Sequence, residues 1–272
     1  MLVKEINVNN YITKSNLPSS DYVINPYVGC PHACKYCYAC FMRIFTNHEE
    51  EWGTFLDVKN CDTPIDKKKL VGKKIFISSV TDPYNPFEKK YEITRKILSE
   101  LCDVDCSIDI TTKSDLVLRD IDILKRLKDV RVAFSINTLD EKFKKDMDHA
   151  PSIERRLEAL KKLHEEGIKT ILFMSPIFPY ITKWKEIIDL TKEFVDEYWF
   201  ENLNLRFPYK KTVLEYIRNE YSDIYPEYKK IYEEGNTFYW EVLSYNIEQY
   251  CNEKNISYQN YFHHDKLVRN KK

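Results

Sequence analysis

The chain has 272 residues, of which 43% are hydrophobic and 31% are charged, and its formal net charge is −1. This length and composition favour a globular protein with one compact domain and an extension, able to bury a full core without disulfide bonds. The near-neutral charge lacks the basic excess that is typical of nucleic-acid-binding proteins. No apolar run approaches the roughly 18 residues that a membrane span needs.

The amino-terminal segment, MLVKEINVNNYITKSN, lacks the apolar core of a signal peptide, so we expect a cytoplasmic protein. A reducing cytosol disfavours structural disulfide bonds. The 8 cysteines of the chain are therefore expected to serve metal or redox chemistry, or to be buried as free thiols.

Short apolar and β-branched runs recur along the chain and predict buried parallel strands. Six such runs lie at residues 22–28, 74–80, 107–112, 131–137, 170–175 and 198–205.

Amphipathic helical periods lie between the later strand-like runs. Ile93, Ile97 and Leu101 share one helix face. A second helix is predicted after Ser152, a candidate N-cap, and it is expected to end at Gly167. A third is predicted to begin near Trp184.

The alternation of strands and helices predicts a parallel sheet with right-handed crossovers. Six units predict an α/β fold of the incomplete (β/α)6 TIM-barrel type, with its chemistry at the carboxyl ends of the strands. Residues 1–205 are assigned to this partial barrel and its N-terminal lead-in. Residues 206–272 are assigned to a mainly helical C-terminal extension with a short final strand at 256–262, expected to close the barrel or shape the substrate mouth. His263 and His264 are expected on its surface.

Three cysteines follow the first strand-like run at the spacing C-x3-C-x2-C: Cys30, Cys34 and Cys37. Three thiolates from one loop can hold three corners of a cubane [4Fe–4S] cluster, which ordinarily takes four cysteine ligands, so that one iron keeps an open position. A zinc site that also uses Cys40 is the alternative, and unligated thiols are a third interpretation. With a cluster, Cys40 is expected to be a small buried residue on the following helix. His32 inside the loop is interpreted as loop structure or as a hydrogen-bonding neighbour of the cluster.

This run, with its flanks NPYVGC and CYAC, resembles the radical S-adenosylmethionine (SAM) superfamily, and within it the branch around spore photoproduct lyase. It also resembles the family called radical SAM mobile pair protein B. The resemblance covers about residues 20–205. It implies that Cys30, Cys34 and Cys37 bind a [4Fe–4S] cluster whose open iron is chelated by SAM. It further implies reductive cleavage of SAM to a 5′-deoxyadenosyl radical, which abstracts a hydrogen atom from the substrate, in an oxygen-sensitive enzyme.

The same resemblance implies roles for residues around SAM. It places Tyr36 near the adenine, Thr81 and Asp82 at the amino group, Lys113 at the carboxylate, and Ser135 and Asn137 near the methionine or ribose. It implies that Tyr38 helps to relay the radical or a hydrogen atom.

The chain departs from the lyase pattern at Ser79, where that branch keeps a cysteine that donates a hydrogen atom to the product radical. A serine O–H is a much poorer hydrogen-atom donor than a thiol S–H, and Cys40 or Cys251 would have to replace it. The near-neutral charge also departs from a DNA-gripping enzyme.

Three classes of function therefore stay open. They are a radical enzyme acting on a small molecule, peptide or cofactor; a DNA or RNA lesion-repair or modification enzyme; and a non-catalytic iron–sulfur or zinc module. The chemistry implies an electron donor such as flavodoxin or ferredoxin as partner. The mobile-pair resemblance suggests a second radical SAM protein.

Overall fold

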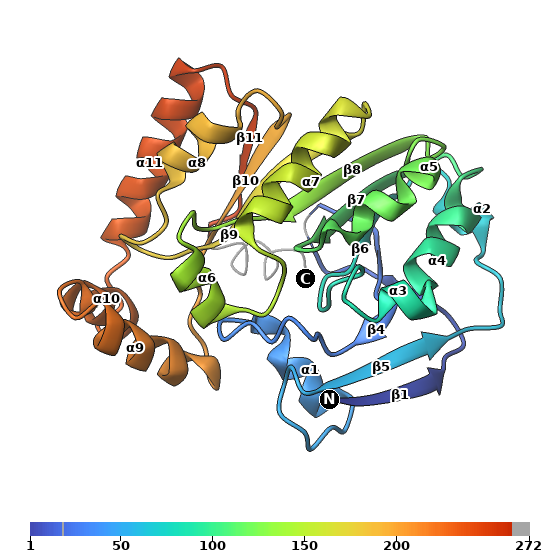
Figure 1. The fold of residues 1–272 in the computed structure, drawn as a ribbon, viewed down its shortest axis with the longest axis horizontal. Helices are drawn as coiled ribbons and strands as arrows, with labels where there is room; N and C mark the ends of the chain where they lie inside the picture. Colours follow the sequence, from blue (N-terminus) through green and yellow to red (C-terminus); the bar gives the residue numbers. More distant parts are fainter. Residues whose placement is uncertain (18, 263–272) are drawn as a thin grey trace.

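The computed structural model describes residues 1–17 and 19–262, so His263 and His264 lie outside the described residues. Its main sheet has eight strands in the order β11-β10-β9-β8-β7-β6-β3-β2. Every pair from β3 to β10 is parallel, and the sheet curves as a partial barrel (Figure 1). The parallel strands are β3 (Tyr22–Ile24), β6 (Lys74–Ile77), β7 (Ser107–Thr112), β8 (Asp129–Ser135), β9 (Lys169–Ile177) and β10 (Glu197–Asn202). The predicted incomplete α/β barrel is confirmed.

Both edges of the barrel sheet carry an added strand. Strand β2 (Ile12–Lys14) pairs antiparallel with β3. Strand β11 (Tyr258–Asn260) pairs parallel with β10, within the range where a final strand was predicted. The carboxyl-terminal segment is thus hydrogen-bonded into the barrel sheet itself.

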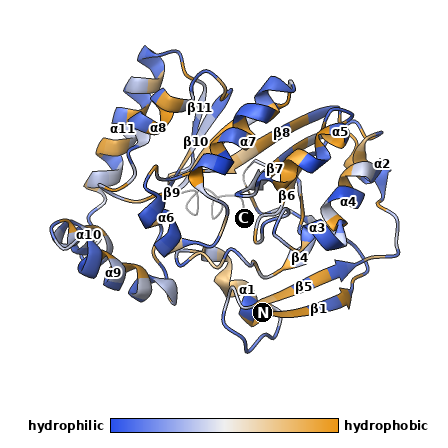
Figure 2. Ribbon diagram, viewed as in Figure 1, coloured by the Kyte–Doolittle hydropathy of each residue, from blue (hydrophilic) through white to orange (hydrophobic). Residues whose placement is uncertain are grey.

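The helices alternate with the strands, and the three predicted amphipathic helices are present. They are α4 (Ile93–Leu101), α7 (Ile153–Glu165) and α8 (Trp184–Thr191). At the start of α7 the Ser152 hydroxyl accepts the Arg155 N–H at 3.3 Å, and at its end Gly167 has a φ of 78°. Figure 2 shows apolar and polar residues mixed along α7, as expected for a helix that covers a sheet with one face.

The remaining helices are short or belong to the extension. The barrel segment contains η1 (Tyr38–Phe41), α1 (Met42–Phe45), α2 (Lys67–Leu70), α3 (Glu88–Tyr91), η2 (Asp115–Asp120), α5 (Ile121–Leu124) and α6 (Glu141–Met147). The extension contains α9 (Tyr209–Glu220), α10 (Tyr225–Tyr232) and α11 (Phe238–Glu253).

A second, three-stranded sheet in the order β1-β5-β4 was not predicted. It contains β1 (Leu2–Asn7), β5 (Phe55–Asn60) and β4 (Tyr27–Val28) (Figure 1). The single strand predicted at 22–28 is therefore wrong: the chain leaves the barrel after Ile24 and pairs its next residues with β5. Pro26 lies at the break, and as a proline it has no N–H to donate to a neighbouring strand. Its carbonyl accepts the Lys59 N–H at 3.2 Å.

The predicted second strand also ends earlier than expected, at Ile77 instead of residue 80. Ser78 has a φ of 70°, in the left-handed region, which ends the extended conformation. Its N–H still donates to the Ile24 carbonyl at 2.8 Å. The turn that follows carries Thr81 and Asp82 toward the loop that holds the cysteines.

The amino-terminal side of the barrel is closed by an ion-pair cluster. Arg131 on β8 donates to both carboxylate oxygens of Asp109 on β7, at 2.7 and 2.8 Å, and to Glu197 on β10 at 3.0 Å. Its guanidinium also lies 5.3 Å from the ring centre of Trp199. The Arg131–Asp109 pair joins the neighbouring strands β7 and β8, whereas the Arg131–Glu197 pair reaches past β9 to β10, so together the contacts span four strands of the curved sheet.

The loop that carries the cysteines depends on a close backbone approach at Gly29. Gly29 has a φ of 85°, and a Cβ atom there would lie 2.4 Å from the Phe55 carbonyl oxygen. We expect Gly29→Ala to lower the free energy of unfolding by about 2–5 kcal/mol, because left-handed strain costs roughly 1–2 kcal/mol and overcrowding about 1–3 kcal/mol.

Gly167 provides the matched control, since its φ is 78° but nothing lies within 4 Å of an added Cβ. Gly167→Ala should lower the free energy of unfolding only by the cost of left-handed backbone strain, about 1–2 kcal/mol. Urea unfolding of both apo-proteins, followed by circular dichroism, measures the difference. Equal losses would contradict the close approach at Gly29.

Candidate active site

A cavity of about 500 Å³ opens at the carboxyl ends of β6 to β10. It collects nearly all of the residues that the sequence singled out: Cys30, Cys34, Cys37, Tyr36, Tyr38, Thr81, Asp82, Lys113 and Ser135. Asn137 is the exception. Its amide donates to the Pro176 carbonyl at 3.1 Å, and it is not among the residues that line the cavity. The fold thus brings four separate chain segments with predicted residues to one site.

The three cysteines are thiols that burial keeps protonated while no metal is bound. All three are free thiols. Burial raises the pKa of Cys34 to about 12, and it raises the pKa of Cys30 well above its usual range. Hydrogen bonds oppose this effect: the His32 backbone stabilises a Cys30 thiolate, and backbone groups of Ala39 and Cys40 stabilise one at Cys37. Such thiols lose their protons when a metal binds, so this donor set fits a metal cofactor.

Among residues 1–17 and 19–262, no three His, Cys, Asp or Glu side chains are arranged as the ligands of a single metal ion. A [4Fe–4S] cubane binds each thiolate at a different iron atom, so its ligands do not converge on one centre.

Cys40 differs from the expectation of a buried residue on a following helix. It lies in the 3-10 helix η1, is half-buried, and lines the cavity. Cys251, the other cysteine considered as a substitute hydrogen donor, is fully buried on α11 and does not line it.

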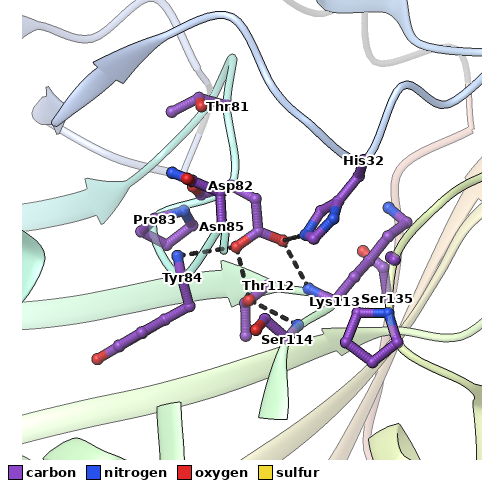
Figure 3. Close-up of polar contacts among 12 residues, drawn as sticks. His32, Thr81, Asp82, Pro83, Tyr84, Asn85, Thr112, Lys113, Ser114 and Ser135 are labelled. Carbon is purple, nitrogen blue, oxygen red and sulfur yellow. Dashed lines mark hydrogen bonds and ion pairs between the residues drawn. The ribbon is translucent and has the colours of Figure 1, made fainter. Parts of the chain in front are cut away.

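The Asp82 carboxylate ties the cysteine loop to two barrel strands (Figure 3). One oxygen accepts His32 Nε2 at 3.1 Å and the Lys113 N–H at 2.8 Å. The other accepts the Thr112 hydroxyl at 2.7 Å and the Tyr84 N–H at 2.9 Å. A carboxylate has about four acceptor positions, so these four donors use them all.

The charge state of Asp82 follows from this shell. Burial raises the pKa of its carboxyl, but the His32 ring and the surrounding donors outweigh burial and hold the pKa below its ordinary value. Asp82 is therefore an anion at neutral pH, 6% exposed, at the edge of the cavity. The ring nitrogen His32 Nδ1 is buried, with no hydrogen-bond partner in the described part of the chain.

Two further predicted residues bind backbone atoms of neighbouring loops. The Thr81 hydroxyl donates to the Gly29 carbonyl at 2.6 Å, which links the turn after β6 to the start of the cysteine loop. The Tyr38 hydroxyl donates to the Ser79 carbonyl, and its ring is half exposed at the cavity.

Lys113 is a cation that lines the cavity next to the cysteine loop. Burial lowers the pKa of its ammonium, but the electrostatic influence of the Cys34 sulfur and of the Asp148 and Asp82 carboxyl groups outweighs burial and leaves the pKa raised. Its Nζ lies 5.9 Å from the centre of the Tyr36 ring. The lysine thus carries its charge between the cysteine loop and the aromatic side chain that was predicted to lie near adenine.

A buried acid–base pair, missed from the sequence, supports that side of the cavity. Asp148 accepts the Tyr36 hydroxyl at 3.2 Å and Arg156 Nη2 at 2.8 Å. Arg156 also donates to the Ser135 carbonyl at 3.2 Å. The sequence offered one signal for this pair, since Arg156 lies among the apolar positions on one face of α7. In the structure Arg156 is 1% exposed, and a buried cation needs a partner of opposite charge.

The far side of the cavity is aromatic and was also missed. It is lined by Phe76 on β6, Phe173 on β9, Trp199 on β10 and Tyr261 beyond β11. Phe173 and Trp199 pack edge to face with ring centres 5.5 Å apart. Above them the Ser175 hydroxyl donates to the Glu201 carboxylate. These residues come from separate chain segments, so no local motif in the sequence predicts that they line one cavity.

Comparisons with known proteins identify the family of this chain. Residues 24–191 match the family model described as the Radical SAM superfamily. The chain is 41% identical over 215 residues to an uncharacterised protein of Methanocaldococcus jannaschii, covering 79% of this chain and 82% of that relative. It is 37% identical over 174 residues to an uncharacterised protein of Acidianus two-tailed virus, covering 59% of this chain and 57% of that relative.

Two solved structures share the fold. A variant of spore photoproduct lyase with bound AdoMet and dinucleoside spore photoproduct superposes with a TM-score of 0.59 at 16% identity, covering 78% of this chain and 65% of the lyase. SuiB of Streptococcus suis, bound to S-adenosylmethionine, gives a TM-score of 0.56 at 17% identity, covering 88% of this chain and 49% of SuiB. The chain thus spans less than two thirds of either structure. Since the matched family model covers most of the barrel and includes the three cysteines, this chain belongs to the radical SAM superfamily.

Proposed function

We propose that this radical SAM enzyme reductively cleaves SAM at a [4Fe–4S] cluster held by Cys30, Cys34 and Cys37, and that the resulting 5′-deoxyadenosyl radical abstracts a hydrogen atom from an organic substrate. The superfamily uses this cluster and SAM. The observation that carries the proposal is that three cysteine thiols, one buried and two half-buried, share one cavity with a half-buried lysine and a buried aspartate. The protein's part is to position and shield the reacting groups.

Lys113 and Asp82, a cation and an anion that both line the cavity, are suited to the two charged ends of an amino acid. Lys113 is proposed to bind the SAM carboxylate, because its ammonium lies beside Cys34 at the cysteine loop. Asp82 is proposed to attract the SAM amino group as a fixed negative charge. Its acceptor positions are already used, so Thr81, which lines the same cavity, is the better candidate for direct contact.

The aromatic side chains on the two sides of the cavity are proposed to enclose the reacting molecules between them. Tyr36, fixed by Asp148 and by edge-on packing against Phe178 at 5.3 Å, is suited to lie against adenine. Ser135, on β8, is proposed to lie near the methionine or ribose. Asn137 is proposed to act indirectly, by holding the Pro176 carbonyl beside the cavity. Tyr38, half exposed at the mouth, is proposed as a radical or hydrogen-atom relay.

A second candidate is lyase-like action on a nucleic-acid lesion. The fold likeness to spore photoproduct lyase favours it. Two features count against it: Ser79 stands where the lyase branch has a thiol that donates a hydrogen atom, and a net charge of −1 provides no basic excess for binding nucleic acid.

An electron donor such as flavodoxin or ferredoxin, and a second radical SAM protein, are the proposed partners. Among the described residues no helix is long and apolar enough to cross a membrane.

We expect anaerobically reconstituted and reduced protein to form 5′-deoxyadenosine from SAM, because an open iron beside bound SAM permits the cleavage. The triple variant Cys30/Cys34/Cys37→Ala should bind no cluster and form none, by iron analysis and chromatography. The matched control is Cys102→Ala with Cys106→Ala, two buried thiols remote from the cavity, which should keep both properties. A wild-type protein that held zinc and no iron would refute the proposal.

We expect Lys113→Met to weaken SAM binding about 10- to 100-fold while leaving the iron content unchanged, because a charge-assisted hydrogen bond contributes about 1.5–3 kcal/mol. Equilibrium dialysis of labelled SAM with the reconstituted protein measures the change. Lys142→Met, at a solvent-exposed lysine paired with Glu220, is the matched control and should bind SAM normally. Unchanged affinity in Lys113→Met would remove the lysine from the SAM shell.

Nucleic-acid binding separates the two candidate functions. If the substrate is a small molecule or peptide, the reconstituted protein should show no affinity for single- or double-stranded DNA or RNA even at low salt, as measured by fluorescence anisotropy. Affinity that falls steeply with added salt, as phosphate contacts require, would instead support the lesion-enzyme candidate.

A further inference from the structure

The aromatic residues of the cavity form one layer of side chains inside the barrel. This ring layer consists of Phe76, Phe173, Trp199 and Tyr261, all of which line the cavity. On β10, Trp199 lies between Glu197 and Glu201 on one face of the strand, because side chains two residues apart share a face. Glu197 belongs to the ion-pair cluster of Arg131, and Glu201 lines the cavity. The ring layer therefore lies between the ion-pair cluster and the carboxyl-terminal rim of the cavity.

Three rings of this layer pack against one another edge to face. The ring centre of Trp199 lies 5.5 Å from that of Phe173 and 5.7 Å from that of Tyr261, at interplanar angles of 83° and 89°. Trp199 is buried, whereas Phe76 and Phe173 are half-buried and line the cavity. Part of the surface of these two phenyl rings is therefore available to a molecule that enters the cavity.

The ring layer has no charged side chain of its own. The Arg131 guanidinium lies 5.3 Å from the ring centre of Trp199 and already binds the carboxylates of Asp109 and Glu197. An anion among the rings would lose its hydration without gaining a partner. A cation is attracted by aromatic rings, but Arg131 already lies over Trp199 and would repel a second positive charge. The layer therefore favours an uncharged group.

We propose that the ring layer binds an uncharged aromatic ring of the substrate while SAM occupies the half of the cavity that holds the cysteines. The inference rests on the proposed function, which places SAM in that half. An aromatic ring suits the layer because it can pack edge to face on Phe76 and Phe173, and because its burial removes apolar surface from water. The net charge of −1 favours a ring carried by a small molecule over a base of a nucleic acid.

The first test compares four fluorinated probes of similar size by ¹⁹F nuclear magnetic resonance, using reconstituted, unreduced protein saturated with SAM. The probes are fluorobenzene, fluorocyclohexane, 4-fluorobenzylammonium and 4-fluorobenzoate. We expect fluorobenzene to bind about 10-fold more tightly than either ion, and about 2- to 10-fold more tightly than fluorocyclohexane, because aromatic packing adds to simple burial. Equal or tighter binding of the ammonium or the carboxylate probe would overturn the inference.

The second test removes one ring at a time. Phe173→Leu and Phe76→Leu should each weaken fluorobenzene binding about 2- to 10-fold and leave the affinity for SAM unchanged. Phe45→Leu is the matched control, since Phe45 is 75% exposed on α1 and does not line the cavity. Circular dichroism identifies a variant that fails to fold, and the other variant then decides. Unchanged fluorobenzene affinity in a folded Phe173→Leu or Phe76→Leu protein would contradict the ring layer as the binding site.

Competition experiments locate the bound ring and its source. SAM should not displace fluorobenzene, because the two are expected in different halves of the cavity; displacement would place the probe at the adenine position beside Tyr36 and overturn the inference. Thymidine should not displace fluorobenzene either. Displacement by thymidine would assign the ring to a nucleobase and overturn the small-molecule source.

The proposed function and this inference fail in different ways. If the wild-type protein binds no cluster or forms no 5′-deoxyadenosine from SAM, the proposed function is wrong. If it does both, but the probes bind without preference for the uncharged aromatic ring, only the role of the ring layer is wrong.

Discussion

The saturated carboxylate of Asp82 is the contact on which the geometry of the site depends. Its four donors come from the cysteine loop, from the turn after β6 and from the end of β7, three segments that are remote in the sequence. A buried anion is tolerated only with such a complete shell. The carboxylate therefore joins the cysteines to the barrel more rigidly than the loop backbone alone would.

The opposite side of the cysteine loop is held by steric fit with the small sheet. Gly29 lies against Phe55 and Gly53 lies against Ala33, at distances that no side chain would allow. The β1-β5-β4 sheet thus serves as a support for the loop, and the chain passes from the barrel strand β3 into this sheet at the break around Pro26. Polar contacts fix the inner side of the loop, and close packing fixes the outer side.

This arrangement divides the cavity into two chemical halves. One half holds the thiols with Lys113 and Asp82, where charges suit a zwitterionic cofactor. The other half is built from aromatic rings that face inward from β6, β9 and β10, above the ion pairs of Arg131. A substrate bound in the aromatic half would lie beside the cofactor and away from water, as radical chemistry requires.

The sequence by itself determined the features that depend on local pattern. The cysteine spacing marked the candidate cluster-binding loop, and the alternation of strands and helices predicted the barrel, because hydrophobic periodicity and short-range spacing can be read directly from the sequence. Only the tertiary structure decided the rest. It split the first strand, placed Cys40 at the cavity and Asn137 outside it, and filled the acceptor positions of Asp82. Each of these results depends on contacts between residues that are far apart in the sequence, and no local sequence pattern indicates such contacts.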